Sequence, residues 1–155
     1  MKKSVKSLVL ILLVAAVLIG VKVFFPDVFA IFFPPEEPGE IAEDGIYTSK
    51  EDVALYIHTY GKLPSNFITK DEAEALGWSG GKLDKYAKNK CIGGDYFGNF
   101  EGKLPKKSGR VYTECDIDTL GASSRGEKRI VFSNDGLVYY TDDHYETFEL
   151  LYGTP

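Results

Sequence analysis

Two acidic residues on one short segment and a histidine near the C-terminus are the side chains suited to acid–base chemistry. The segment Val111–Ile117 alternates apolar and polar residues, so a strand there would place Glu114 and Asp116 on one face and Cys115 on the other. A carboxylate that faces a cleft can accept a proton near neutral pH, and His144 can donate one. Taken alone, this segment favours the plainer interpretation that both acids face water.

Basic residues elsewhere in the chain indicate the kind of substrate. An arginine fork offers paired donors to phosphate oxygens, and a lysine at a helix start beside a cleft can hold a phosphate. We expect one face of the predicted sheet to gather a base, an acid and a set of cations: Glu114, His144, Arg125 and Arg129, with Lys70 at its edge. Such a set suits phosphoryl transfer without a metal ion.

A two-carboxylate glycosidase is a weaker hypothesis from the same strand. Adjacent positions on one face of a strand lie about 7 Å apart, within the range of inverting enzymes. Glu114 and Asp116 would have that separation, but the hypothesis leaves His144 and both arginines without a role.

Capping boxes begin two predicted helices ahead of these residues. Thr48-Ser-Lys-Glu51 starts the first helix, which ends at Gly61, and Thr69-Lys-Asp-Glu72 starts the second, which ends at Gly77. A short third helix is expected over residues 83–87.

Alternating segments separated by turn residues then predict strands. Their ranges are Cys91–Phe97, Arg110–Ile117, Arg129–Ser133, Leu137–Thr141 and His144–Leu151. Helices first and strands afterwards indicate an α+β fold, in which N-terminal helices pack on a five-stranded antiparallel sheet.

The N-terminus has the pattern of a targeting segment. Residues 8–21 form an unbroken apolar run behind three early lysines, about the length of a signal-peptide core. We expect residues 1–30 to be a signal peptide cleaved after Ala30. A membrane anchor through residues 7–33 is the alternative, because apolar character resumes after Lys22.

The remaining chain divides into a linker and one folded domain. Residues 31–44 are rich in proline and acidic residues and are expected to form a flexible linker. Residues 45–155 would be the exported domain. The formal net charge of −5 argues against nonspecific binding of nucleic acid through bulk charge, so a polyanion needs a local basic patch.

The chain has two cysteines, Cys91 and Cys115. Export permits a disulfide, although strand alternation argues mildly against pairing and a bulge would undo that argument. No zinc-binding spacing is present, and no metal site is expected.

Short motifs recur along the folded part in a recognisable order. They are Tyr60-Gly-Lys-Leu-Pro64, Ile68-Thr-Lys-Asp-Glu72, Ala75-Leu-Gly-Trp78, Ile92-Gly-Gly-Asp95, Glu101-Gly-Lys-Leu-Pro105, Lys107-Ser-Gly-Arg110 and Asp143-His-Tyr145. With these motifs the chain resembles the exported guanyl-preferring ribonucleases of bacteria, the barnase-like family. The resemblance runs from about Asp52 to Leu150 and implies the microbial ribonuclease fold.

The resemblance implies a catalytic role for each of five residues. Glu114 matches the general base of the family, and His144 matches its general acid. Lys70, Arg125 and Arg129 match the cations that hold the phosphate. The spacing from Arg125 to Arg129 fits the family, although the preceding loop is one residue longer than usual.

The resemblance also implies a guanine site. The loop from Phe97 to Glu101 would cup the base, with backbone N–H groups meeting O6 and N7 while the Glu101 carboxylate accepts from N1–H and the amino group. Tyr145 would lie beside the base, and Asp95 would support the loop and Glu114. The substrate-binding residues are therefore expected to be Asp95, Phe97, Gly98, Asn99, Glu101 and Tyr145.

The activity implied is a secreted, monomeric endoribonuclease that cuts single-stranded RNA 3′ to guanosine. The 2′-OH would attack the adjacent phosphorus to give a 2′,3′-cyclic phosphate, without a metal or organic cofactor. DNA lacks the 2′-OH and is not expected to be a substrate. A noncatalytic binding module on the same scaffold is the alternative, and the presence of both Glu114 and His144 counts against it.

Two positions depart from the family pattern. Phe100 stands where the family commonly has an arginine, and Gly98 stands where it has a serine. Loss of a cation at position 100 predicts weaker attraction for RNA. A barstar-like inhibitor is the protein partner implied, and its acidic face uses such cations, so Phe100 should weaken that binding too.

Overall fold

The computed structural model describes residues 41–155. The expected signal peptide, the alternative anchor over residues 7–33 and most of the expected linker lie outside the described residues. Within residues 41–155, none of the helices has the length and apolar character needed to cross a bilayer.

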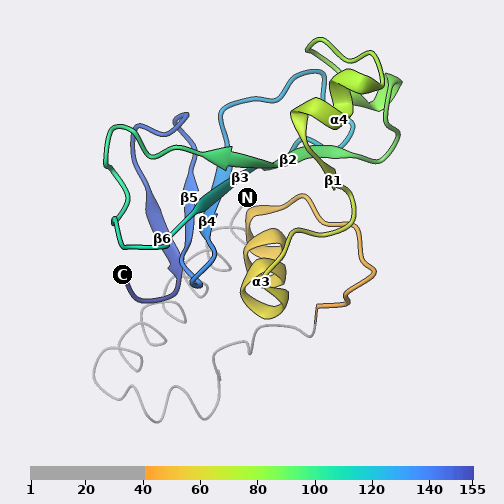
Figure 1. The fold of residues 1–155 in the computed structure, drawn as a ribbon. Helices are drawn as coiled ribbons and strands as arrows, with labels where there is room; N and C mark the ends of the chain where they lie inside the picture. The colour runs from red at the N-terminus through yellow and green to blue at the C-terminus, as the bar shows by residue number, and fades with distance from the viewer. Residues whose placement is uncertain (1–40) are drawn as a thin grey trace, which may run out of the picture. The chain divides into compact units, whose positions relative to one another are not determined.

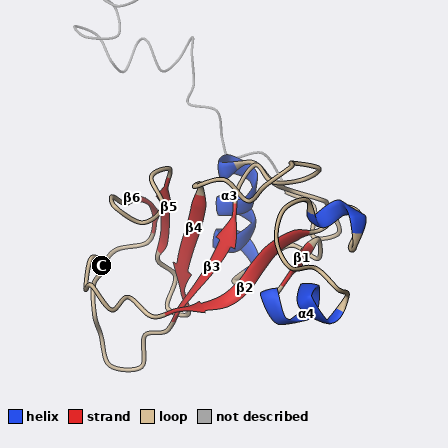
Figure 2. Ribbon diagram, turned by 90° about the horizontal axis from the view of Figure 1, so that it is seen from above, coloured by secondary structure: helices blue, strands red, loops and turns tan. Residues whose placement is uncertain are grey.

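One sheet organises the described part, with strand order β1-β2-β3-β4-β5-β6 (Figure 2). The strands are β1 (Phe67–Ile68), β2 (Cys91–Phe97), β3 (Tyr112–Asp116), β4 (Arg129–Ser133), β5 (Val138–Thr141) and β6 (Glu149–Tyr152). From β2 to β6 all neighbours pair antiparallel, so the predicted α+β class is confirmed.

The strand β1 is an addition to the predicted sheet. It pairs in parallel with β2, Phe67 opposite Cys91, so the sheet is six-stranded and mixed rather than five-stranded and antiparallel. Two residues are too few to show an alternating pattern, and β1 forms because the backbone of Asn66 accepts a hydrogen bond from the N–H of Cys91.

The first helix, α3 (Lys50–Tyr60), begins one residue later than predicted. Ser49 is the N-cap and accepts from the N–H of Asp52, whereas Thr48 was expected to cap. The Thr48 hydroxyl instead accepts from the backbone N–H of Thr119, a contact across the fold. The predicted end is confirmed, since Gly61 adopts a left-handed conformation with φ of 67°.

The second helix, α4 (Lys70–Ala75), begins as predicted. The Thr69 hydroxyl accepts from the N–H of Glu72, and the Glu72 carboxylate accepts from the N–H of Thr69, which completes the capping box. Lys70 is therefore the first residue of α4, the helix that lies beside β2 (Figure 1). The predicted third helix is a short 3-10 turn, Leu83–Lys85.

The sheet buries a different cluster on each face. On one face α3 lies against the sheet (Figure 1); the cluster between them comprises Val53, Ala54, Ile57, Cys115, Ile117, Ile130 and Val138. A second cluster comprises Leu104, Tyr112, Val131, Leu137 and Tyr139. Because side chains alternate along β3, Cys115 belongs to the α3 side, and Tyr112 and Glu114 lie on the opposite face.

The segment before β6 differs from its prediction. His144–Leu151 was expected to be a strand, but β6 covers only Glu149–Tyr152 and the chain from residue 142 to 148 is a loop. His144 and Tyr145 have positive φ angles of 54° and 75°, which a strand does not allow. The Asp143 carboxylate stabilises this loop by accepting hydrogen bonds from the backbone and hydroxyl of Thr147.

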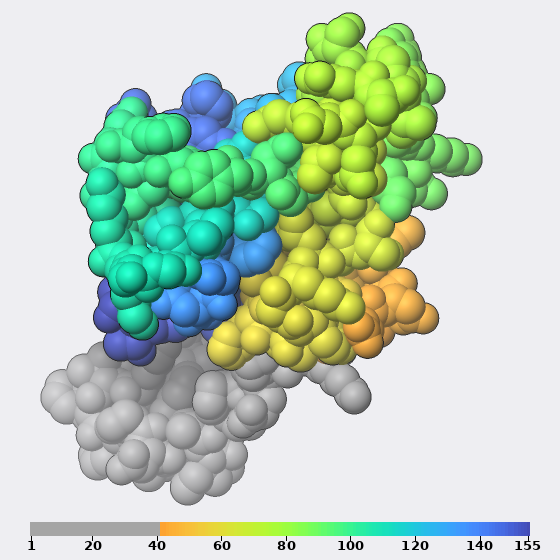
Figure 3. All heavy atoms as spheres, in the orientation of Figure 1, coloured from red at the N-terminus to blue at the C-terminus, as the bar shows by residue number. Residues whose placement is uncertain are grey.

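Residues 41–44, which the sequence assigned to the linker, lie against α3. Ile41 is buried, and its carbonyl accepts from the hydroxyl of Tyr60 at 2.6 Å. The Tyr56 hydroxyl donates to the carbonyl of Glu43 at 2.9 Å. In Figure 3 these residues, in orange, lie directly beside the yellow residues of α3.

Cys91 and Cys115 are free, buried thiols. A bulge in β2 between Gly93 and Asp95 shifts the register, and Cys115 lies opposite Gly93 rather than Cys91. Burial raises the pKa of both thiols, so neither is a ready nucleophile.

Candidate active site

Glu114 on β3 is the centre of the site. Its side chain is only 10% exposed, and each carboxylate oxygen has a partner. Lys70 Nζ lies 2.6 Å from Oε1, and the Tyr145 hydroxyl donates to Oε2. These contacts join three distant parts of the chain: the start of α4, the middle of the sheet and the loop before β6.

These partners decide the charge of Glu114. Burial alone would raise the pKa of its carboxyl, but hydrogen bonds from Lys70 and Tyr145 and the nearby charges outweigh burial and hold it below its ordinary value. The pKa of Tyr145 is raised by burial and by the adjacent carboxylate. Glu114 is therefore an ionised carboxylate at neutral pH, able to accept a proton.

Asp95 supports this arrangement from the neighbouring strand. The bulge in β2 brings Asp95 opposite Glu114, and Gly94 takes a φ of 102° within it. The Asp95 carboxylate accepts from the backbone N–H of Lys70 at 3.2 Å and lies 3.9 Å from its ammonium. Asp95 thus helps to hold the first turn of α4, and with it the lysine that contacts Glu114.

The interpretation favoured for this strand, that both acids face water, is wrong, since Glu114 and Asp116 are both buried. Asp116 is 1% exposed and accepts from Arg125 Nε and Nη2, both at 2.7 Å. Arg129 Nε lies 3.0 Å from Oδ1, the oxygen that also accepts from Arg125 Nη2. Asp116 is the counterion that holds both arginines, and the two-carboxylate hypothesis fails because this acid is committed to ion pairs.

Removing that counterion should destabilise the fold. Asp116→Ala leaves Arg125 and Arg129 without their shared carboxylate, and breaking a buried ion pair costs about 3–5 kcal/mol. Urea unfolding of parent and variant measures this loss. The control is Asp118→Asn, which removes the charge of an exposed acid paired with Lys128 at 2.6 Å while tolerating the positive φ of 58° at this position; a loss of about 0–1 kcal/mol is expected. Equal losses would contradict the role of Asp116.

His144 lies on the loop before β6 and is exposed. Its ring is 4.8 Å from that of Tyr145, the residue that contacts Glu114. The loop therefore brings the exposed histidine and the buried carboxylate to the same side of the sheet. The sequence predicted that His144 and Glu114 lie on the same side of the sheet. It placed His144 on a strand, however, and did not predict the loop that carries it.

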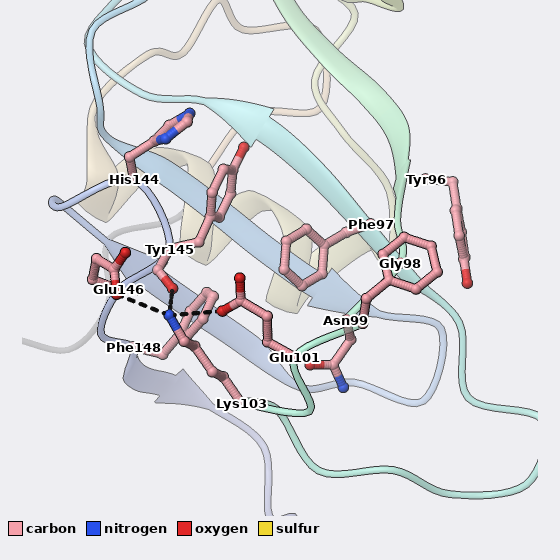
Figure 4. Close-up of a pocket in the computed structure, with 11 residues that line it drawn as sticks. Tyr96, Phe97, Gly98, Asn99, Glu101, Lys103, His144, Tyr145, Glu146 and Phe148 are labelled. Carbon is pink, nitrogen blue, oxygen red and sulfur yellow. Dashed lines mark hydrogen bonds and ion pairs between the residues drawn. The ribbon is translucent and has the colours of Figure 1, made fainter.

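A pocket of about 480 Å³ opens beside these residues (Figure 4). The residues that line it are Tyr96, Phe97, Gly98, Asn99, Phe100, Glu101, Lys103, His144, Tyr145, Glu146 and Phe148. The predicted loop residues and Tyr145 all line this pocket. Asp95 does not, because it contacts Lys70 instead.

The loop that forms one wall is closed by a buried asparagine. Asn99 is 8% exposed, and its amide side chain donates to the carbonyl of Leu104 and accepts from the N–H of the same residue. Asn99 also has a positive φ of 45°, which asparagine tolerates better than most residues. The loop thus has a defined shape before any ligand binds.

Lys103 joins the two walls of the pocket and was not predicted as a site residue. Its ammonium lies 2.9 Å from Glu101, 3.1 Å from Glu146 and 2.9 Å from the carbonyl of Tyr145 (Figure 4). The Glu101–Pro105 motif contained this lysine. Nothing in the sequence indicated its partners, because Glu146 and Tyr145 are more than forty positions away.

Gly98 and Phe100, the two departures from the family pattern, are in contact. A Cβ atom at position 98 would overlap the Phe100 ring, which lies over the glycine while remaining 91% exposed. Gly98 has no positive φ, so the ring and not the backbone favours glycine here.

Among the three predicted cations, the side chains of Lys70 and Arg125 are 36% and 28% exposed, whereas that of Arg129 is 3% exposed and lies 6.0 Å from the Tyr145 ring. No group of three or more potential metal ligands occurs among residues 41–155.

Comparisons with known proteins agree with this architecture. A family model described as ribonuclease matches residues 50–152. A ribonuclease of Heyndrickxia coagulans is 49% identical over 100 residues, covering 63% of this chain and 91% of that one. A ribonuclease of Bacillus intermedius is also 49% identical over 100 residues, but these cover only 61% of its length. Guanyl-specific ribonuclease Sa of Kitasatospora aureofaciens is 42% identical over 59 residues, covering 37% of this chain and 62% of that one.

Proposed function

Because the chain belongs to the ribonuclease family, we propose that it is a secreted endoribonuclease that cleaves single-stranded RNA 3′ to guanosine. One observation carries the proposal: Glu114 is a buried, ionised carboxylate beside a pocket lined by His144 and Glu101. A base, an acid and a receptor for a nucleobase are thus close together on one side of the sheet.

In the proposed reaction Glu114 takes the proton from the ribose 2′-OH, and that oxygen attacks the adjacent phosphorus. The bond to the 5′ oxygen of the next nucleotide breaks, and His144 gives that oxygen its proton. The resulting 2′,3′-cyclic phosphate is hydrolysed with the roles exchanged: His144 takes a proton from water and Glu114 returns one to the 2′ oxygen. Each transfer contributes typically about 10²–10⁴ in rate.

Three cations would stabilise the charge that develops on the phosphoryl oxygens. Lys70 is already beside Glu114, and Asp116 fixes Arg125 and Arg129 through their Nε atoms. Such preorganised charges need not reorganise during the reaction, which is why they stabilise a transition state more than water does.

Guanine would occupy the 480 Å³ pocket against the loop from Phe97 to Glu101. The Glu101 carboxylate would accept from N1–H and the amino group of the base. Adenine has neither donor in those positions, so it would leave a carboxylate and backbone N–H groups unpaired.

A series of the dinucleoside phosphates GpN, ApN, CpN and UpN tests the function. The highest kcat/KM is expected for guanosine on the 5′ side, with rates unchanged by excess EDTA. A noncatalytic module would cleave none of the series. Cleavage without base preference would refute the guanine assignment alone, and loss of activity with EDTA would indicate a metal nuclease.

Tyr145→Phe should shift the pH dependence of cleavage. The variant keeps the ring that packs against Phe97 and Phe148 but removes a hydrogen bond that lowers the pKa of Glu114. Because Glu114 must be ionised to accept a proton, its higher pKa moves the acid limb of the kcat/KM profile to higher pH. Tyr152→Phe, which alters a ring stacked on His58, is the control. An unmoved acid limb in Tyr145→Phe would contradict this account.

Phe100→Arg should strengthen RNA binding and steepen its salt dependence. Each added phosphate contact on a single strand changes the slope of log K against log salt by roughly 0.7. A close charge pair with an acidic barstar-like inhibitor would contribute roughly 1.5–7 kcal/mol. KM measured at two salt concentrations, for parent and variant, provides the check.

A double variant is the control for that substitution, because the Phe100 ring occupies the space that a Cβ at position 98 needs. KM is therefore measured for Phe100→Arg alone and for Phe100→Arg combined with Gly98→Ser. If Phe100→Arg instead weakens binding without changing the salt slope, the aromatic ring is what the site uses.

A further inference from the structure

A second groove lies on the other side of the base-recognition loop. It has a volume of about 240 Å³ and is lined by Tyr96, Phe97, Gly98, Asn99, Pro105, Lys106, Lys107, Arg110 and Tyr112. The first four of these residues also line the guanine pocket, so the two depressions share one wall. Neither Glu114, His144 nor the three phosphate-binding cations line the groove.

Tyr96 is an aromatic platform at the junction of the two depressions. It is 68% exposed, and among the large apolar side chains of residues 41–155 only Phe100 is more exposed. Tyr96 follows Asp95 on β2, so alternation directs it away from the face that carries Glu114; Figure 4 shows it pointing away from Phe97 and Tyr145. An aromatic side chain this exposed contributes little to the core, so its ring is available to a ligand.

The charge of the groove is positive. Three cations line it, Lys106, Lys107 and Arg110, and two of them share one carboxylate: Lys107 and Arg110 contact Asp135 at 3.3 Å and 2.9 Å. Arg110 is a fixed wall, since its side chain is 4% exposed and also donates to the carbonyl of Pro105. Lys106 is exposed and has no ion-pair partner within residues 41–155, which leaves its ammonium available to an anion.

An exposed ring and an unpaired ammonium that line one groove are the combination that binds single-stranded nucleic acid. Bases stack on the ring whatever their identity, and the cation follows the phosphate. The direction of the RNA follows from His144, which lines only the guanine pocket. In the proposed reaction His144 protonates the leaving 5′ oxygen, so the RNA on the 3′ side of the cut runs past His144. The RNA on the 5′ side of the guanosine is then the part that can reach the groove.

We propose that this groove is a subsite for the nucleotide immediately 5′ to the cleaved guanosine. The base of that nucleotide stacks on Tyr96, and the phosphate that joins it to the guanosine contacts Lys106. The inference rests on the proposed function and extends it to a longer substrate. Because stacking tolerates every base, the subsite increases affinity without selecting a sequence.

Two substrates that differ only by the 5′ nucleotide test the subsite. They are GpA and dUpGpA, in which the deoxyuridine carries no 2′-OH, so that only the bond after guanosine can be cut. The parent should cleave dUpGpA with a kcat/KM roughly tenfold or more above that of GpA, in line with the effect of one stacked base. The readout is the ratio of the two values, which cancels effects on the shared chemistry.

The ratio should fall towards one in Tyr96→Ala and in Lys106→Ala, and should survive in Tyr96→Phe, which keeps the ring. Lys106→Ala should also reduce the salt slope of dUpGpA binding by roughly 0.7, with no such change for GpA. Tyr86→Ala and Lys88→Ala are matched controls, because both residues are exposed and line neither depression; both should keep the ratio.

The outcomes separate this subsite from the proposed function. Equal kcat/KM values for the two substrates in the parent, or a ratio that persists in Tyr96→Ala and Lys106→Ala, overturns the subsite while guanosine cleavage stands. If the parent cleaves neither substrate, the proposed function fails. Fluorescence anisotropy with labelled 2′-O-methyl UGA and GA then decides the subsite, which requires tighter binding of the trinucleotide that is lost in both variants.

Discussion

Glu114→Gln should lower kcat for cleavage after guanosine by about 10²–10⁴ while the protein remains folded. The amide has nearly the shape of the carboxylate, so the packing of β3 is retained, but it cannot take the proton from the 2′-OH. His144→Ala should have an effect of the same order, because the leaving oxygen then departs without a proton. Dinucleotide kinetics measure both effects, and urea unfolding verifies that each variant is folded.

The chain provides a matched control for the histidine. His58, its only other histidine, lies on α3 with its ring stacked 4.3 Å from Tyr152, and neither residue lines the pocket. His58→Ala should keep near-parental kcat. Near-normal cleavage in Glu114→Gln or His144→Ala would mean that the proton-transfer roles are wrongly assigned, even if the protein cleaves RNA.

Glu101→Gln should remove most of the preference for guanosine. A carboxylate can accept from both N1–H and the amino group of guanine, whereas an amide offers one acceptor and places a donor against the other position. A site built to hydrogen-bond a polar group rejects an analogue that lacks it strongly, so the ratio of kcat/KM for GpA over ApA should fall by about 10²-fold or more. The loss should come mainly from slower cleavage after guanosine.

Glu146→Gln is the control for that substitution. Glu146 lines the same pocket and contacts the same Lys103 ammonium, at 3.1 Å, but it lies on the opposite wall. Glu146→Gln should leave the preference for guanosine nearly intact. If the preference instead depended on the position of Lys103, both substitutions would lower it to a similar extent. An unaltered preference in Glu101→Gln would show that the loop backbone recognises the base without this carboxylate.

Local patterns predicted the elements that depend on neighbouring residues. The Thr69–Glu72 capping box places Lys70 at the first position of α4, and Gly61 ends α3, because caps satisfy backbone groups within one turn of helix. Alternation predicted β2 and β4 with their observed bounds and separated Glu114 from Cys115. The motifs of the barnase-like resemblance then assigned roles to residues that composition alone would have left as surface charges.

Only the tertiary structure decided which charged side chains contact one another and which are held in buried ion pairs. Asp116 and Glu114 have the same chemistry and the same face of β3, yet one is the buried counterion of two arginines and the other remains beside the pocket. The Thr48 hydroxyl accepts a hydrogen bond from Thr119 and does not cap α3 as predicted. Lys103 connects two loops through its contact with the carbonyl of Tyr145. His144 lies in a loop and not in the predicted strand, because its φ angle is positive. Each outcome depends on partners tens of residues away, and no pattern within a helical turn or a single strand reports such contacts.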